Sequence, residues 1–199
     1  ILIASLVAMR QDNLKLRLAY STVSQLGYVV LGAVLANAAG VVGGALHIAM
    51  HAFGKITLFF CAGAILVAAH KTEVSELDGI GRAMPITMFA FLIGSLSIIG
   101  LPPMGGLWSK WYLALGTLEA GELALLAVLM ISSLLNVAYV RPLPVRAFLQ
   151  APTSGKRIRG IKEAPLTCLT AIVLTSLGCL ALFFYPEPLY RLAHLLVTG

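Results

Sequence analysis

The chain has 199 residues, of which 59% are hydrophobic and 11% are charged, and its mean hydropathy is +0.94. A typical soluble domain carries about 25% charged residues, so this composition excludes an ordinary soluble globular protein and indicates a membrane protein. The formal net charge of +6 lies in segments that flank apolar spans, which favours lipid headgroups over nucleic acid as the partner of these charges.

Apolar segments of membrane-spanning length recur along the chain, and the charged residues fall in clusters between them. Residues 1–9 are apolar but too few to cross a bilayer, and we expect them to end a helix that begins upstream, in a longer protein of which this chain is the C-terminal part. Membrane helices are predicted over residues 19–38, 41–69, 84–101, 107–118, 123–139 and 165–185. The fold class is therefore all-α, a polytopic transmembrane bundle of about six helices in a single membrane domain covering residues 1–199.

The predicted helix over residues 84–101 ends in a segment that cannot continue it. Pro102 and Pro103 donate no backbone hydrogen bond, and Gly105 and Gly106 free the backbone. A short helix with a lysine, Lys110, follows directly. This pattern is typical of the discontinuous helices of transporters.

Two later segments are expected to lie outside the membrane core. The basic segment 141–162 is predicted to be a solvated loop. The tail after residue 189 is predicted to form an interfacial amphipathic helix, with leucines at 189, 192 and 196.

Lys55 is the only formal charge between residues 18 and 69. Placing an ammonium group at the centre of a membrane helix costs roughly 2.5–3.5 kcal/mol on insertion scales, so such a residue indicates a functional site. His47, His51 and Lys55 stand at i, i+4 and i+8, which places them along one helix face. A row of titratable groups inside a membrane is typical of proton relays.

Each of these residues also has a plainer interpretation. The two histidines could be hydrogen-bonded core residues or a metal pair, but the zincin pattern requires Glu where Ile48 stands. Lys110 could extend to an interface, and Lys15 could be a solvated loop charge. The serines and threonine at 21, 22 and 24 are typical of helix packing. We predict no metal site and no cofactor.

Membrane orientation depends on how the short helix is counted. If residues 107–118 cross alone, six basic residues lie on each side. If they are half of a broken crossing, eleven lie on one side and Arg191 alone on the other, and the positive-inside rule places the larger group in the cytoplasm.

Three stretches resemble one family of membrane proteins. They are Arg10-Gln-Asp-Asn-Leu-Lys-Leu-Arg-Leu-Ala-Tyr-Ser-Thr-Val-Ser-Gln-Leu-Gly-Tyr28, Leu46-His-Ile-Ala-Met-His-Ala-Phe-Gly-Lys-Ile-Thr-Leu-Phe-Phe60 and Gly100-Leu-Pro-Pro-Met-Gly-Gly-Leu-Trp-Ser-Lys-Trp111. They resemble the antiporter-like proton-pumping subunits of complex I, membrane-bound hydrogenases and Mrp-type antiporters. Within that family, these stretches are most similar to the D-type component of the Mrp sodium/proton antiporters.

The resemblance implies a subunit of two inverted five-helix repeats, of which this chain holds the second. It implies a proton pathway through Lys55, His47, His51 and Lys110, with a less defined role for Lys15. The first repeat, which carries a glutamate and its partner lysine in that family, has no counterpart in this chain.

The main hypothesis is a proton-translocating subunit of a multisubunit sodium/proton antiporter in the bacterial inner membrane, a transporter rather than an enzyme. The expected partners are other membrane subunits, the lipid bilayer, protons and monovalent cations. The alternative is a proton-pumping subunit of a complex I or hydrogenase type oxidoreductase. Two further hypotheses are a structural scaffold subunit that retains the lysines and a redox subunit with its own quinone chemistry.

Overall fold

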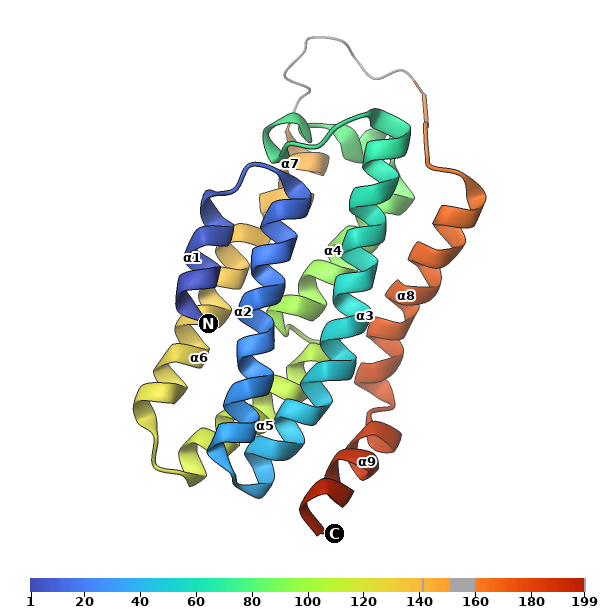
Figure 1. Cartoon of the computed structure of the whole chain (residues 1–199). Helices are drawn as coiled ribbons and strands as arrows, with labels where there is room; N and C mark the ends of the chain where they lie inside the picture. The colour runs from blue at the N-terminus through green and yellow to red at the C-terminus, as the bar shows by residue number, and fades with distance from the viewer. Residues whose placement is uncertain (141, 151–159, 199) are drawn as a thin grey trace.

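The computed structural model describes residues 1–140, 142–150 and 160–198, and these residues are helical apart from short connections (Figure 1). The α-helices are α1 Leu2–Arg10, α2 Leu14–Leu35, α3 Ala38–Ala69, α4 Pro85–Ile99, α5 Gly106–Glu119, α6 Leu123–Val140, α7 Pro142–Leu149, α8 Leu166–Phe184 and α9 Glu187–Thr198. Two 3-10 turns, η1 Val74–Glu76 and η2 Ile80–Arg82, connect α3 to α4. The predicted all-α class is confirmed.

The long helices run side by side, and α3 lies at the centre, where it packs against α2, α4, α5, α8 and α9 (Figure 1). Within the described ranges, four helices are long and apolar enough to cross a membrane: Leu14–Leu35, Ala38–Ala69, Leu123–Leu149 and Leu166–Phe184. Large apolar side chains such as Val30, Val34 and Leu174 face outward. This outward apolar surface is what a helix bundle in lipid requires, so the chain is a multi-pass membrane protein.

Two of the helices begin earlier than predicted, because asparagine side chains cap them. The Asn13 side chain accepts a hydrogen bond from Leu16 N, so α2 begins at Leu14 rather than near residue 19. Asn37 accepts from Gly40 N in the same way, so α3 begins at Ala38. Capping satisfies backbone donors that have no partner inside the helix.

The predicted break lies between α4 and α5, which follow one another from one end of the bundle to the other (Figure 1). Gly100 ends α4 with φ +86°, a conformation that only glycine adopts readily. Gly106 begins α5 so close to α4 that a Cβ atom would lie 2.0 Å from the Ser97 carbonyl oxygen. With 15 and 14 residues, each half spans about 21–23 Å, less than the ~30 Å hydrocarbon core, so together they form one interrupted crossing.

One expectation about the segment 141–162 is wrong. Residues 142–149 form α7 rather than a solvated loop, because Leu143 and Ala147 pack into the core and Arg146 pairs with a carboxylate. Residues 141 and 151–159 lie outside the described residues. The predicted tail helix is present as α9, and it packs against α3.

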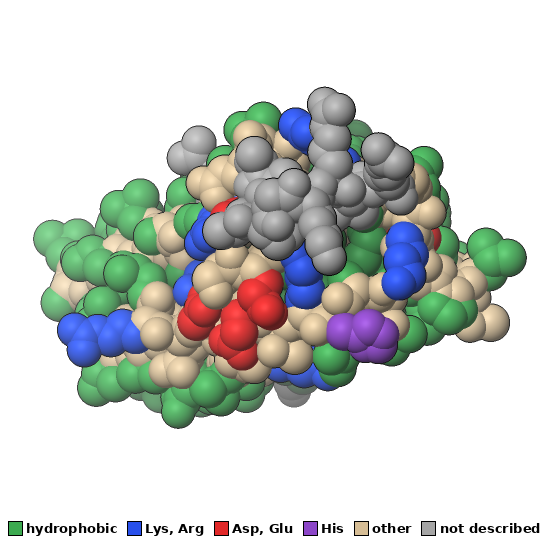
Figure 2. Space-filling view, turned by 90° about the horizontal axis from the view of Figure 1, so that it is seen from above, with side chains coloured by type: hydrophobic (Ala, Val, Ile, Leu, Met, Phe, Trp, Pro, Cys, Tyr) green, Lys and Arg blue, Asp and Glu red, His purple; other side chains and the backbone are tan. Residues whose placement is uncertain are grey.

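Charged side chains gather at the end of the bundle where α1 meets α2 and α3 meets α4. We call it the charged end, and Figure 2 views it directly. The described basic residues there are Arg10, Lys15, Arg17, Lys71, Arg82, Arg146 and Lys162, whereas Arg191 lies in α9 at the opposite end.

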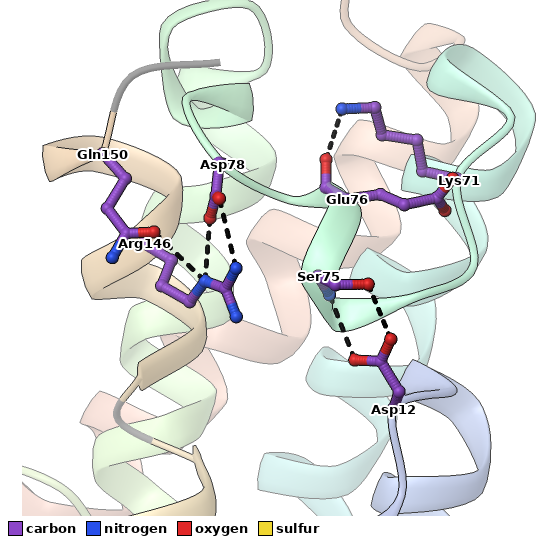
Figure 3. A network of polar contacts seen from close by, with 7 residues as sticks. All are labelled: Asp12, Lys71, Ser75, Glu76, Asp78, Arg146 and Gln150. Carbon is purple, nitrogen blue, oxygen red and sulfur yellow. Dashed lines mark hydrogen bonds and ion pairs between the residues drawn. The ribbon is translucent and has the colours of Figure 1, made fainter. Parts of the chain in front are cut away.

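Polar contacts join the segments of the charged end (Figure 3). Arg146 of α7 donates two hydrogen bonds to Asp78, at 2.7 and 3.1 Å. Asp12, between α1 and α2, accepts from the Ser75 backbone and hydroxyl at 3.1 and 2.6 Å. The Lys71 ammonium donates to the Glu76 carbonyl. These contacts hold the connection between α3 and α4 against α7 and the start of α2.

Candidate functional site

Lys55 is buried in α3, fourteen residues before that helix ends at Ala69, or about 21 Å along its axis. Its ammonium group donates to the Leu18 carbonyl at 3.1 Å and to the Ser21 hydroxyl at 2.7 Å, both in α2. No described carboxylate pairs with it. Among the described residues the charge is therefore balanced by neutral oxygen acceptors, which suits a lysine that exchanges its proton.

Lys110 lies one turn after the break and turns back toward the end of α4. Its Nζ atom donates to the Ile98 and Ile99 carbonyls at 3.0 and 2.8 Å and to the Ser133 hydroxyl at 3.3 Å. The last carbonyls of a helix lack partners within the helix and carry its negative partial charge. The break thus creates an acceptor site for an ammonium group at mid-depth in the bundle, and Lys110 occupies it.

The two histidines lie between these lysines as part of a stack of rings. His47 and His51 stack with their centroids 5.7 Å apart, and Tyr28 of α2 stacks on His47 at 5.2 Å. The Lys110 ammonium lies 5.3 Å from the centre of the Tyr28 ring, within cation–π range. The shared face predicted from the i, i+4, i+8 spacing is therefore occupied by buried side chains that line the interior of the bundle.

His47 has partners for both of its ring nitrogens. Nε2 lies 3.1 Å from the Gln25 Oε1, which can only accept, so Nε2 carries a proton in this arrangement. Nδ1 lies 2.9 Å from the Ser109 hydroxyl, which is also 3.1 Å from the Gly106 carbonyl. Ser109 can donate to neutral His47, or turn to Gly106 and accept from a charged His47. His47 can thus gain and lose a proton while keeping both partners.

His51 is different, because its Nε2 atom is buried with no hydrogen-bond partner in the described part of the chain. A metal site is not apparent either: residues 1–140, 142–150 and 160–198 contain no cluster of three His, Cys, Asp or Glu side chains. The arrangement that is present can hold, move and release protons through nitrogen and hydroxyl groups.

Lys15 lies apart from this group. Its side chain is exposed in the first turn of α2, at the charged end, three residues before Leu18. Pro102, Pro103, Gly105 and Gly106 form the break, and the Gly105 backbone donates to the Cys179 carbonyl of α8 at 3.1 Å. The break is thereby anchored to a neighbouring helix.

Several polar residues of the site were not predicted. Three of them, Ser21, Gln25 and Tyr28, share one face of α2 at i, i+4 and i+7 and reach Lys55, His47 and the ring stack. The unusual polarity of the first turns of α2 was the signal that could have identified them. The others are Ser109, Ser133, Asn136 and Tyr139.

Comparison with known proteins identifies the family. Residues 1–136 match the family model described as NADH:quinone oxidoreductase/Mrp antiporter, TM. NADH-quinone oxidoreductase subunit N from Desulforudis audaxviator is 41% identical over 94% of this chain and 39% of that protein. In the structure of the Mrp complex from Dietzia sp. DQ12-45-1b, one chain is similar with a TM-score of 0.87 and 24% identity over 97% of this chain and 44% of its own length.

A third relative is a chain of the membrane-bound sulfane sulfur reductase, an archaeal respiratory membrane complex. It has a TM-score of 0.83 and 27% identity over 96% of this chain and 38% of that chain. The chain thus spans about two fifths of the length of the curated relatives that it matches along most of its own length. With more than half of its residues matched by the family model, this chain belongs to the NADH:quinone oxidoreductase/Mrp antiporter transmembrane family.

Proposed function

We propose that this chain is the proton-translocating part of an antiporter-like subunit in a redox-driven membrane complex of the NADH:quinone oxidoreductase type. The observation that carries the proposal is the pair of lysines held at mid-depth by neutral acceptors, Lys55 by α2 and Lys110 by the end of α4, with two histidines between them. Groups of this kind inside a membrane bind and release protons.

In the proposed pathway, protons pass between Lys55 and Lys110, with His47 and His51 as intermediate carriers. The break at Pro102, Pro103, Gly105 and Gly106 supplies the acceptors for Lys110 and separates α5 from the rigid hydrogen-bond ladder of α4. Lys15 would act at the charged end, where an exposed ammonium group can exchange protons with water before they reach Lys55. A change of charge elsewhere in the complex would shift the proton between the two lysines.

The redox-driven complex is preferred to the sodium/proton antiporter that the sequence motifs favoured. The 41% identity over 94% of the chain is to a protein named for the quinone-linked complex. The likeness to the Mrp complex is structural, at 24% identity, and supports the fold. The Mrp-type antiporter therefore stays as the second candidate, and a structural scaffold as the third.

The orientation follows from the single crossing formed by α4 and α5. With that crossing counted once, the described basic residues of the charged end outnumber those of the opposite end, where Arg191 stands alone among the described residues. The positive-inside rule then places the charged end in the cytoplasm. We propose a bacterial cytoplasmic membrane location, with other membrane subunits of the complex as partners.

The test uses the full-length subunit in its assembled complex, purified and placed in sealed vesicles. Quinone reduction should drive a pH change inside the vesicles, whereas an imposed sodium gradient should not. Flavin or iron–sulfur subunits should co-purify. A pH change that follows the sodium gradient and needs no electron donor would favour the Mrp-type antiporter, and no pH change under either condition would leave the scaffold.

A further inference from the structure

Lys55 is hydrogen-bonded to a chain of hydroxyl groups and not to the histidines. Its ammonium donates to Ser21 at 2.7 Å, and the Ser21 hydroxyl lies 2.9 Å from the Tyr139 phenol of α6. Tyr139 is also hydrogen-bonded to the Asn136 side-chain oxygen. All four side chains are buried.

The histidine row makes no such connection with Lys55. Within the described ranges, His51 Nε2 has no hydrogen-bond partner, and the polar partners of His47 are Gln25 and Ser109. The two rings meet face to face, and a ring face carries no transferable proton. In this arrangement the hydroxyl chain offers Lys55 the direct hydrogen-bonded exit.

The hydroxyl chain leads toward Lys110. The Tyr28 phenol lies beside the side chains of Ser132, Ser133 and Asn136, and Ser133 accepts from Lys110 at 3.3 Å. Two buried polar atoms face this region without a hydrogen-bond partner among the described residues, the Tyr28 hydroxyl and the Asn136 Nδ2. Buried polar atoms of this kind are commonly satisfied by an ordered water molecule, which needs two to four polar partners.

We propose that Ser21 and Tyr139 form a second proton route between Lys55 and Lys110, parallel to the histidines and closed by one water molecule beside Tyr28 and Asn136. This inference rests on the proposed function, in which the two lysines exchange protons. Asn136 is a positioning residue, because an amide oxygen can orient the phenol but does not relay its proton.

The transfer balances as a series of single proton shifts. A proton leaves Lys55 Nζ for the Ser21 oxygen while the Ser21 hydroxyl proton moves to the Tyr139 oxygen. The phenolic proton of Tyr139 moves to the water, which passes one of its own protons by way of Ser133 to a neutral Lys110. Lys55 ends neutral and Lys110 charged, and each hydroxyl group then rotates back. A phenol has one proton, and both Ser21 and Asn136 accept it, so Tyr139 can switch between them.

The test compares variants of the full-length subunit in its assembled complex in vesicles, with proton flux measured per turnover of the driving reaction. Ser21→Ala and Tyr139→Phe should each lower the flux roughly fivefold or more, the factor that corresponds to one lost hydrogen bond. Ser21→Thr, which keeps the hydroxyl, should restore most of it. The matched controls are Ser24→Ala, which removes an equally buried hydroxyl of α2 that is hydrogen-bonded to Ser5 and Ser132, and Tyr20→Phe.

Flux in Ser21→Ala and Tyr139→Phe equal to that in the controls would overturn the second route. If Lys55→Ala also kept full flux, the proposed function itself would fail, so the two failures are distinguishable. Should Tyr139→Phe fail to assemble, the comparison of Ser21→Ala with Ser21→Thr still decides, because a purely structural loss of the small serine would not be restored by the hydroxyl of threonine.

Discussion

The Nζ atom of Lys110 lies 2.8 Å from the carbonyl oxygen of Ile99, the last residue of α4. The lysine of the second half-helix thus caps the first half. With Ile98 and Ser133, this contact gives all three ammonium protons an acceptor. The break in the helix and the charge beside it are therefore one structural unit, because the charge satisfies carbonyl groups that the break leaves open.

Replacing Lys110 by alanine should destabilise the junction between α4 and α5. The Ile98 and Ile99 carbonyls would lose their partner, and an unsatisfied buried acceptor costs about 1–3 kcal/mol. The measurement is the thermal unfolding midpoint of the detergent-solubilised full-length subunit. Lys15→Ala is the control, since Lys15 is exposed and its loss should change stability by less than about 0.5 kcal/mol. Equal midpoints for the two variants would contradict the capping role.

Replacing Gly106 by alanine should disrupt the break more severely. The new Cβ atom would lie 2.0 Å from the Ser97 carbonyl oxygen, and neither backbone can move without separating α4 from α5. We expect low yields of folded subunit, measured by size-exclusion chromatography. Gly63→Ala is the matched control: nothing lies within 4 Å of its added Cβ atom, and helix propensity favours alanine there by about 1 kcal/mol. A folded Gly106→Ala variant with normal yield would show that the close approach is not required.

Ser109→Ala should impair proton transfer through His47. A charged His47 would lose the acceptor for its Nδ1 proton, at 2.9 Å in the native chain, so its charged form would be less stable. We expect proton flux in vesicles to fall roughly fivefold, the effect of one hydrogen bond. Ser95→Ala is the control, because the equally buried Ser95 hydroxyl donates to Phe91 of its own helix. Unchanged flux in Ser109→Ala would remove Ser109 from the pathway.

The two ion pairs of the described residues should differ in strength. Arg146 makes two hydrogen bonds to the mostly buried Asp78, so Arg146→Ala should cost about 1–3 kcal/mol, the range for hydrogen bonds to charged groups. Arg191 and Glu187 are 77% and 52% exposed, so Arg191→Ala should cost less than about 0.5 kcal/mol. Thermal unfolding of both variants in low and high salt gives the comparison. A larger loss for Arg191→Ala would contradict this ranking.

Much of the fold was predictable, because long apolar spans and a Pro-Pro-x-Gly-Gly segment determine local structure directly. The helix break at Pro102–Gly106 and the shared face of His47 and His51 are confirmed. The existence of α7 was not predicted, since its stability depends on tertiary burial of Leu143 and on the contact of Arg146 with Asp78, 68 residues away in sequence.

The site was less predictable than the fold, because its contacts join distant segments. Lys55 reaches Ser21 across 34 residues, and Ser21 reaches Tyr139 across 118. Nothing in the local pattern distinguishes these hydroxyl groups from ordinary packing residues. The turn of Lys110 back onto Ile98 and Ile99 also depends on the geometry of the break rather than on spacing.

The central claim is that Lys55 and Lys110 pass protons to one another, and the ratio of protons moved to electrons transferred tests it most directly. This ratio should be measured in vesicles containing the assembled complex with wild-type subunit, Lys55→Ala or Lys110→Ala, with Lys15→Ala as the exposed control. We predict a lower ratio in both buried-lysine variants, at unchanged complex assembly. A wild-type ratio in both would contradict the account.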